Sequence, residues 1–396
     1  MGLLSRLGSG SAATGLDLGS GAIKLVQLQE GRDGVSLYKA GSAPTPPNAV
    51  KGGVVVDPLA AAQAVRSLLE ALQIDAANVV AGIAGPTVVV REVPLPAMSD
   101  RQLRRSIQWE ARNYISFPVE DSVVEFQVLD RPAANAASSA QMKVLLVAAP
   151  RDMVDSQVET LELAGLEPLA VEIQPFAALR GLIASNGQTY GEGETTALVG
   201  IGAAYTEITI VKDAQFVLSR IIPIAGNAFT DAIKNALDVD VEEAGRIKET
   251  TTQVVLSEEE RAALDPAAQQ ASRAIEPLLD ELIREVRRSL AYHDFQQQSP
   301  DAGAGELGVN EILLSGGGAK LPRINEYFQA QLGVPVAVLN VFGPGRLKAH
   351  GVNPDYLQAH APTLLVAAGL ALRELLLSKQ RRLKTPENSH AARPGA

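Results

Sequence analysis

The chain has 396 residues and a formal net charge of -10, which argues against a nucleic-acid partner because phosphate backbones are bound by clustered lysine and arginine. It contains no cysteine, which excludes disulfides and thiolate chemistry, and its four scattered histidines disfavour a histidine-rich metal site. Hydrophobic residues make up 46% and aromatic residues only 4%, so we expect two or three domains with cores of Ala, Val, Leu and Ile.

Both ends of the chain differ in composition from its middle. Residues 1–13 are rich in Gly and Ser and do not form a secretory signal, so we predict a flexible leader. Residues 377–396 are polar and contain Pro and Gly, so we predict a disordered tail. No apolar run is long enough to span a bilayer, and we therefore expect a soluble, cytoplasmic protein.

The first structured segment, "TGLDLGSGAIKLVQL" at 14–28, reads as two strands joined by a glycine turn. Asp17 stands inside the first, otherwise apolar strand, and a carboxylate is costly to bury without a partner. A metal–phosphate complex is one candidate partner, and Lys24 across the hairpin is the other. A Gly/Pro-rich stretch, a helix over 59–72 and the strands "NVVAGIAG" and "TVVVREVPLP" follow.

A separate unit is predicted to begin near residue 86. Its helix, "MSDRQLRRSIQWEARNYI", has Ser99 at the cap position and Gln102 three residues later, the pattern of a capping box. The strands "SVVEFQVLD" and "KVLLVAAP", a helix over 152–164 and the strand "LEPLAVEI" complete a β-α-β-β-α-β order, which is typical of a compact split βαβ unit.

From Thr196 the opening pattern returns as "TALVGIGAAYTEITIVKDAQFVLSRIIPI". Aligning the two copies sets Asp17 against Gly200 and Lys24 against Glu207. The chain is therefore predicted to be an internal duplication. Further elements are then predicted in order: helices over 228–237, 241–248 and 259–270, a long helix over 275–295, a strand followed by three glycines and a helix, the strand "PVAVLN", and a closing apolar helix.

Three glycine elements allow backbone N–H groups to approach phosphate oxygens: 19–21, the turn at Gly202, and 316–318. In them, "GLDLGSGAIK", "LVGIGAAYT" and "ILLSGGGAKLP" resemble the two phosphate loops and the adenosine motif of the actin-like ATPases, the superfamily of sugar kinases, actin and FtsA. The segments "IQWEARNYISFPVEDSVVEFQVL" and "AAGLALREL" are similar to the PilM family of type IV pilus assembly proteins. The resemblance extends over 15–376.

The resemblance implies an α/β fold: a duplicated, actin-like (ribonuclease H-like) two-lobed fold with an inserted βαββαβ-type subdomain. The first lobe would comprise 14–85 and 166–190, the inserted subdomain 86–165, and the second lobe 191–376. A nucleotide cleft would lie between the lobes.

The resemblance also implies ATP and Mg²⁺ as ligands. Asp17 would hold the metal, through waters, because hard cations prefer oxygen ligands. Gln174 would orient the attacking water, or alternatively cap the helix that follows Pro175. Lys248 would reach the ribose or adenine, or be an ordinary surface lysine. The remaining implied nucleotide contacts are Gly19, Ser20, Gly21, Lys24, Gly202, Ala203, Thr206, Gly226, Asn227, Gly316, Gly317 and Gly318.

Two positions depart from the superfamily pattern. Gly200 stands where relatives usually carry an aspartate, and Gly245 stands where they usually place a ribose-binding glutamate. A lost charge-assisted hydrogen bond costs on the order of 1.5–3 kcal/mol. We therefore expect ATP to be bound with weak or lost hydrolysis.

Function is expected from the same resemblance. It implies a cytoplasmic adaptor beneath the inner membrane that binds the short N-terminal cytoplasmic peptide of PilN, in a groove between the inserted unit and the first lobe. Trp109, Tyr114 and Phe117 are candidate lining residues, with ordinary core packing as their alternative. Other pilus platform proteins and ATPases are expected partners, with membrane contact only through partners. A homo-oligomer, a small-molecule kinase of the same superfamily and an FtsA-like filament-forming protein remain alternatives.

Overall fold

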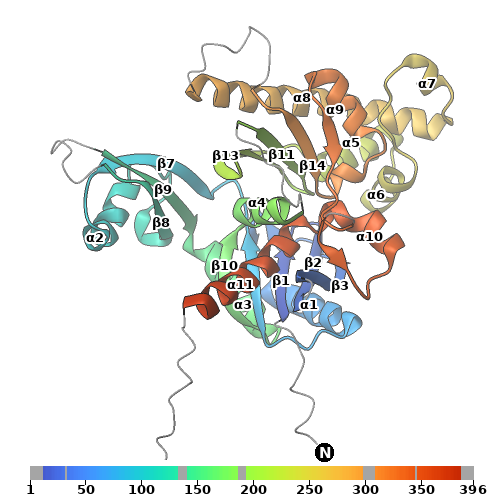
Figure 1. The fold of residues 1–396 in the computed structure, drawn as a ribbon. Coiled ribbons are helices and arrows are strands. Elements are labelled where there is room, and N and C mark those ends of the chain that lie inside the picture. Colours follow the sequence, from blue (N-terminus) through green and yellow to red (C-terminus); the bar gives the residue numbers. More distant parts are fainter. Residues whose placement is uncertain are drawn as a thin grey trace, which may run out of the picture.

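The protein consists of two lobes, one above the other in Figure 1, and a smaller unit that projects to one side of them. The structure is a computed structural model and describes residues 12–31, 34–132, 141–185, 193–297, 308–343 and 346–384. The predictions for 1–11 and 385–396 fall outside the described residues. Part of the predicted disordered tail is helical, because the last helix continues to Lys384.

The first lobe is built on a six-stranded mixed sheet in the order β10-β6-β1-β2-β3-β16. Strands β1, β2 and β3 form an antiparallel meander, whereas β1, β6 and β10 are parallel. The strands are β1 (Ala12–Leu18), β2 (Ala22–Gly31), β3 (Gly34–Pro44), β6 (Asn78–Ile83), β10 (Glu167–Ile173) and β16 (Lys348–Ala349), with a two-stranded hairpin of β4 (Val50–Lys51) and β5 (Val54–Val55) beside them.

Helices cover both faces of this sheet. On one face, Leu16 and Leu18 of β1 join a buried cluster with α1 (Pro58–Leu72). The other face is covered by α4 (Gln174–Ser185) and α11 (Leu365–Lys384), which lie between the two lobes (Figure 1). Gly15 permits this packing, since a Cβ there would lie 2.1 Å from the Ala367 carbonyl oxygen.

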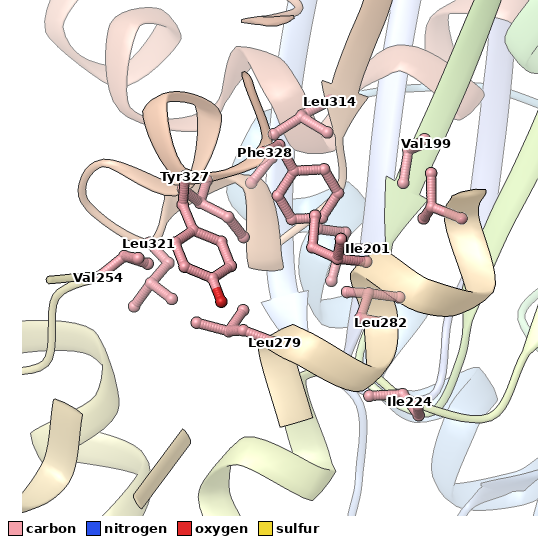
Figure 2. Close-up of a cluster of buried hydrophobic side chains, with 14 of the residues drawn as sticks. Val199, Ile201, Ile224, Val254, Leu279, Leu282, Leu314, Leu321, Tyr327 and Phe328 are labelled. Carbon is pink, nitrogen blue, oxygen red and sulfur yellow. The ribbon is translucent and has the colours of Figure 1, made fainter. Parts of the chain in front are cut away.

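The second lobe repeats this plan with a five-stranded sheet in the order β13-β12-β11-β14-β15. Its outer face packs on helices in one apolar cluster, part of which Figure 2 shows around Ile201, Leu282 and Phe328. The elements are β11 (Thr195–Ile201), β12 (Thr206–Lys212), β13 (Gln215–Ile222), β14 (Glu311–Ser315), β15 (Val336–Val338), α5 (Gly226–Leu237), α6 (Val241–Thr250), α7 (Glu258–Ala262), α8 (Pro266–Gln297) and α9 (Ile324–Leu332). Helix α10 (Pro354–His360) lies beside β3 of the first lobe, where the Tyr356 and Ser42 hydroxyls are 3.4 Å apart.

The strand registers confirm the predicted duplication. In the first lobe Asp17 pairs with Lys24 between β1 and β2, and in the second lobe Gly200 pairs with Glu207 between β11 and β12. These are the positions that the sequence alignment sets against each other. In both lobes the first strand is also parallel to a later strand, β6 or β14, so the two halves share their topology.

The inserted unit has a three-stranded antiparallel sheet in the order β7-β9-β8, with α2 (Asp100–Ala111) packed on it. Its strands are β7 (Val89–Pro96), β8 (Ser122–Asp130) and β9 (Gln141–Pro150). The predicted capping box is present: the Ser99 side chain accepts from the Gln102 backbone N–H, and the Gln102 side chain accepts from the Ser99 N–H. The unit has its own core, which includes Leu103, Ile107 and Met142.

The inserted unit is smaller than predicted. Strand β10 pairs with β6 in the first-lobe sheet, and Leu161 of α3 (Arg151–Leu163) belongs to the buried cluster of α1 and β1. The expected β-α-β-β-α-β unit is therefore corrected, because the separate sheet ends with β9 at Pro150. Strand β10 lies in the first lobe, to which the predicted bounds 166–190 assign it. Periodicity identifies α3 and β10 as elements but carries no information on which sheet they join.

Strand β3 continues into the Gly/Pro-rich stretch after the first hairpin and pairs with β2 along its length. One other prediction differs from the structure. The helix predicted over 259–270 is wrong, because α7 ends at Ala262 and α8 begins at Pro266 and continues through the predicted long helix. Asp265, whose side chain accepts from the Ala268 N–H, and Pro266 mark the new start.

No single helix in the described part of the chain is long and apolar enough to cross a membrane. By length and composition alone, the segments Pro354–Thr363 and Leu365–Lys379 pass the same test together, at a bend of 90°.

Candidate functional site

The two glycine loops of the duplicated halves meet between the lobes. One loop joins β1 to β2 and contains Gly19, Ser20 and Gly21, and the other joins β11 to β12. A Cβ at Gly21 would lie only 2.6 Å from the Ala203 Cβ. The loops are therefore in contact, and the structure brings together the two segments that the sequence predicts to bind phosphates.

The first loop is held by its own turn and by the segment after β3. The Gly19 N–H donates to the Ala22 carbonyl oxygen (3.1 Å). The Thr45 hydroxyl donates to the Gly19 carbonyl oxygen (2.6 Å), and the Thr45 N–H donates to the Gly21 carbonyl oxygen (3.2 Å). These bonds fix the loop carbonyls, which orients the loop before any ligand arrives.

The second loop is held by the first turn of α5. The Gly226 N–H donates to the Gly202 carbonyl oxygen (3.0 Å), and the Asn227 N–H donates to the Ala203 carbonyl oxygen (2.8 Å). Backbone N–H groups at a helix start lack intrahelical partners, so the loop satisfies two of them. The side chain of Asn227 is exposed to solvent.

Tyr205, at the end of the second loop, reaches across to the first lobe. Its hydroxyl donates to the Ala84 carbonyl oxygen at 3.0 Å. Burial raises the pKa of the Tyr205 hydroxyl far above its usual range, and the nearby charges of Glu207 and Asp17 act in the same direction. The hydroxyl therefore remains a neutral hydrogen-bond donor between the lobes.

Asp17 is the buried charge at the centre of the site, with 5% of the residue exposed. One carboxylate oxygen accepts from the Lys24 ammonium (3.0 Å), and the other accepts from the Gln174 side-chain amide (2.9 Å). The ion pair with Lys24, one of the two alternatives for Asp17, is thus present. Gln174 is the first residue of α4, and its side chain binds Asp17 rather than capping the helix.

The donor set around Asp17 is suited to one kind of metal site. Among the described residues, no group of three or more His, Cys, Asp or Glu side chains is arranged to hold an ion. Mg²⁺ is commonly held by one or two carboxylates together with waters and substrate phosphates. A single carboxylate, that of Asp17, is enough for such a magnesium site, because waters and the phosphates of a nucleotide would supply the other oxygens.

The sequence analysis does not select Glu207 as a site residue. In the alignment of the two halves, Glu207 occupies the position that corresponds to Lys24. The Ser219 hydroxyl donates to its carboxyl group at 3.1 Å. Burial raises the pKa of Glu207 to about 7; the Ser219 bond opposes this shift and the charge of Asp17 adds to it. Glu207 also lines a cavity of about 130 Å³ between the lobes, together with the segment from Ala84 to Val90.

Lys248, on α6, lies beside the second loop and is half-buried. Its ammonium group donates to the Thr230 hydroxyl (2.7 Å) and to the Gly226 carbonyl oxygen (3.2 Å). Burial lowers the pKa of Lys248. The side chain therefore supports the start of α5 in this structure, which differs from an ordinary surface lysine.

Thr206 does not belong with the phosphate contacts. The residue is fully buried, and its hydroxyl donates to the Ile224 carbonyl oxygen at 2.7 Å. This buried hydroxyl ties β12 to the segment that precedes α5. Its place in the predicted nucleotide-binding set is therefore corrected.

The three glycines after β14 have different surroundings. Gly316 has a φ of +83°, and a Cβ there would lie 2.4 Å from the Ile201 carbonyl oxygen. A Cβ at Gly318 would lie 2.2 Å from the Ile201 Cγ2, whereas one at Gly317 would meet nothing within 4 Å. Close packing on β11 thus accounts for Gly316 and Gly318, and Gly317 is the member with open space for a ligand.

The two unusual glycines are also in the site region. A Cβ at Gly200 would lie 3.3 Å from the Ser315 hydroxyl oxygen, so this position is closely surrounded. Gly245 has nothing within 4 Å of the same point. There is therefore open space at Gly245, where the superfamily pattern predicts a glutamate.

The predicted groove residues lie at the end of α2 and just after it. Trp109 is 67% exposed, and the Arg112 guanidinium lies 4.8 Å from the centre of its ring. Tyr114 packs against the core of the inserted unit, as its alternative interpretation predicts, and Phe117 is half-buried.

Known proteins resemble the whole chain. It is 29% identical to a chain of the solved "PilM-PilN type IV pilus biogenesis complex", with a TM-score of 0.75, covering 91% of this chain and 98% of that one. The ethanolamine utilization protein EutJ of Carboxydothermus hydrogenoformans, 17% identical with a TM-score of 0.52 and 93% of each chain covered, shares the fold. These likenesses confirm the expected two-lobed actin-like fold.

Cell division protein FtsA is a more distant relative in sequence. The Streptococcus pneumoniae protein (serotype 2, strain D39) is 25% identical over 400 residues, which cover 92% of this chain and 82% of that protein. The Pseudomonas aeruginosa protein (strain PAO1) is 24% identical over 366 residues, covering 83% and 84%. Residues 15–375 match the family described as type IV pilus assembly protein PilM. The chain therefore belongs to the PilM family.

Proposed function

We propose that this type IV pilus assembly protein is an adaptor. It would bind ATP with Mg²⁺ between its lobes, and the N-terminal cytoplasmic peptide of PilN in a groove between the inserted unit and the first lobe. The contact between the two glycine loops, beside a buried Asp17, is the observation that carries the nucleotide half of the proposal. The likeness to a chain of the PilM–PilN complex supports the peptide half. The protein would work on the cytoplasmic side of the inner membrane, where such a peptide is accessible.

Asp17 would supply one oxygen to Mg²⁺ and thereby exchange its present partners for the metal. Lys24 would then be released from its 3.0 Å ion pair and turn to the phosphates, which are the nearest alternative anions. Bound Mg²⁺ would neutralise the phosphate charge. The loop backbone at 19–21 and 202–203 would surround the phosphates, and Gly317 and Lys248 would lie toward the nucleoside.

Hydrolysis is proposed to be weak. Gln174 would have to leave Asp17, to which it donates at 2.9 Å, before it orients a water. The second lobe lacks a carboxylate at Gly200, and Glu207 is held toward its neutral form by burial. The site would therefore serve nucleotide binding and lobe closure more than turnover.

Calorimetric titration with ATP and Mg²⁺ tests the nucleotide half. We expect binding by the unaltered chain, a loss of at least about tenfold in Asp17→Ala because the metal loses its protein oxygen, and no change in Asp155→Ala. Asp155 is the matched control, since it is an exposed aspartate on α3 with no partner among the described residues. Equal affinities for Asp17→Ala and the unaltered chain would contradict the metal assignment.

Titration with a PilN N-terminal peptide tests the other half. We expect the peptide to bind the full chain, and a substitution of Phe117 by Ala to weaken binding if that side chain lines the groove. Repeating the titration with ATP and Mg²⁺ tests whether lobe closure changes the affinity for the peptide. Absence of peptide binding under both conditions would contradict the adaptor proposal while leaving the nucleotide site intact.

A further inference from the structure

The outward face of α2 is basic in a chain that is acidic overall. The helix uses Leu103, Ile107 and Ala111 for the core of the inserted unit. Its opposite face repeats at helical spacing and is exposed to solvent at every position. The members of this basic face are Arg101, Arg104, Arg105, Gln108, Trp109 and Arg112.

The charges of the basic face are only partly neutralised. Arg101 and Arg105 form no ion pair with any described residue, and Arg112 pairs with Glu120. The net charge of -10 is spread over the whole chain. Charges farther away than about 8–10 Å are screened at physiological salt. The electrostatic attraction of the basic face to an anionic surface therefore depends on the local arginines and not on the net charge of the chain.

A tryptophan stands among these arginines without being packed into the fold. Trp109 is 67% exposed, with only the Arg112 guanidinium stacked near its ring, at 4.8 Å from the ring centre. Leaving a large aromatic ring in water has a free-energy cost that a partner surface would remove. Indole rings favour the headgroup level of bilayers, where one side is apolar and the other is wet.

An open groove of about 460 Å³ adjoins the first half of α2 and combines charge with apolar surface. Arg104 and Arg131 line it together with Val128 and Leu129, and Leu129 is 46% exposed. Its two acidic lining residues are Asp100 and Asp130, of which Asp100 is paired with Arg131.

We propose that the basic face of α2 docks the protein directly on an anionic lipid surface, with the arginines at the phosphate headgroups and Trp109 at the same level. Charge complementarity favours this occupant, and the exposed indole favours a bilayer interface over a purely polar partner. Because the apolar stripe of α2 is already buried in the core of its own unit, the helix cannot insert. The contact is therefore superficial, reversible and sensitive to salt.

This inference goes beyond the proposed function, because neither nucleotide nor peptide is needed for docking. It assigns Trp109, a predicted lining residue of the peptide groove, to the lipid surface instead. It also changes the expectation that the protein contacts the membrane only through partners. Direct docking through α2 would hold the inserted unit at the membrane surface.

The chain contains one tryptophan, which makes the proposed site its own probe. We expect the tryptophan emission of the full chain to shift to the blue when vesicles of phosphatidylglycerol and phosphatidylcholine in equal parts are added. Vesicles of phosphatidylcholine alone should leave it unchanged. Raising the salt concentration should reverse the shift, because the attraction is electrostatic.

Sedimentation with the same vesicles tests the arginines. We expect Arg101→Glu with Arg105→Glu to lose at least about tenfold in binding to phosphatidylglycerol vesicles, because two attractive charges become repulsive. The matched control is Arg66→Glu with Arg273→Glu, which makes the same change in net charge at two exposed helical arginines without partners among the described residues. The control should bind as the unaltered chain does.

Three outcomes would overturn the proposal. The first is the absence of both the emission shift and sedimentation with anionic vesicles. The second is sedimentation that is equal in the two double variants, which would locate membrane binding elsewhere on the chain. The third is an emission shift with poly-glutamate but none with vesicles, which would assign the basic face to an acidic protein partner instead.

Discussion

The two lobes present the same hairpin to the cleft but place different charges on it. In the first lobe the register pairs Asp17 with Lys24, and their side chains form a partly buried ion pair. In the second lobe the equivalent pair is Gly200 and Glu207, so the acid has no cation opposite it. The backbone was kept in the duplication while the charges were reassigned.

The two acids therefore have different hydrogen-bond partners. Asp17 accepts hydrogen bonds from a cation, the Lys24 ammonium, and from the Gln174 side-chain amide. Glu207 has the Ser219 hydroxyl as its donor, and burial raises its pKa to about 7. The first lobe thus places an ion-paired carboxylate between the lobes, whereas the second places there a carboxyl group whose pKa burial raises to about 7.

The largest expected effect comes from removing the first-lobe charge. Asp17→Ala would leave the Lys24 side chain, only 17% exposed, without its partner. Breaking a buried pair in this way costs about 3 kcal/mol or more of the free energy of unfolding. Urea unfolding measures it. The double change Asp17→Ala with Lys24→Met removes both charges and should recover part of the loss; a single variant as stable as the unaltered chain would mean that the pair contributes nothing.

The second-lobe acid should make stability depend on pH. The pKa of Glu207 is raised from 4.5 to about 7, so its contribution is fully present below about pH 4.5 and is lost as the pH rises through about 7. The difference of about 2.5 pKa units corresponds to as much as about 3 kcal/mol between these limits, by the conversion of 1.36 kcal/mol per unit.

Glu207→Gln should remove this dependence, because the amide does not ionise. Unfolding free energies of the variant and the unaltered chain, measured from pH 4 to pH 8, should therefore diverge as the pH rises, with the variant becoming relatively more stable. The matched change is Glu125→Gln at an exposed glutamate of β8. Parallel pH curves for Glu207→Gln and the unaltered chain would show that burial does not hold this acid neutral.

The contact between the two loops can be tested by adding a methyl group at Gly21 and removing the one at Ala203. Gly21→Ala would bring two Cβ atoms to 2.6 Å, so the lobes must separate slightly, at a cost of about 1–2 kcal/mol. Faster hydrogen exchange of the loop amides should report this opening. Ala203→Gly in the same chain removes the opposing methyl and should restore slow exchange; failure of that rescue would mean that the loops do not touch in solution.

Much of this comparison is predictable from sequence because it depends on local patterns. The glycine turns, the alternating strands and the capping box at Ser99 each identify their own element. The alignment of Asp17 with Gly200 also agrees with the registers of the two hairpins, β1–β2 and β11–β12. A slip of one residue in either hairpin would move its buried side chains to the opposite face of the sheet. The family resemblance then indicates that the loops face each other.

What the sequence does not predict depends on contacts between distant segments. Nothing local to β10 says that it pairs with β6, and nothing local to Gly316 says that it packs on Ile201. The same holds for Glu207, whose pKa is raised by burial, with the charge of Asp17 from the other lobe adding to the shift. The nucleotide roles of these residues stay predictions until binding is measured.

The smallest expected effect concerns Tyr205, whose side chain extends from the second loop to the first lobe. In the alignment Tyr205 stands opposite Ala22, so only the second loop crosses to the other lobe. Tyr205→Phe keeps the ring and removes the bond to the Ala84 carbonyl oxygen, which is worth about 1 kcal/mol.

Because Ala84 leads directly into the inserted unit, this loss should be local rather than global. We expect hydrogen exchange to accelerate over 84–90 while the exchange of α8 stays unchanged, and Tyr38→Phe, at a tyrosine 46% exposed on β3, to alter neither. Acceleration confined to the second lobe would contradict this view. The Tyr205 bond would then stabilise only its own loop, and the two hairpins would be equivalent in everything but charge.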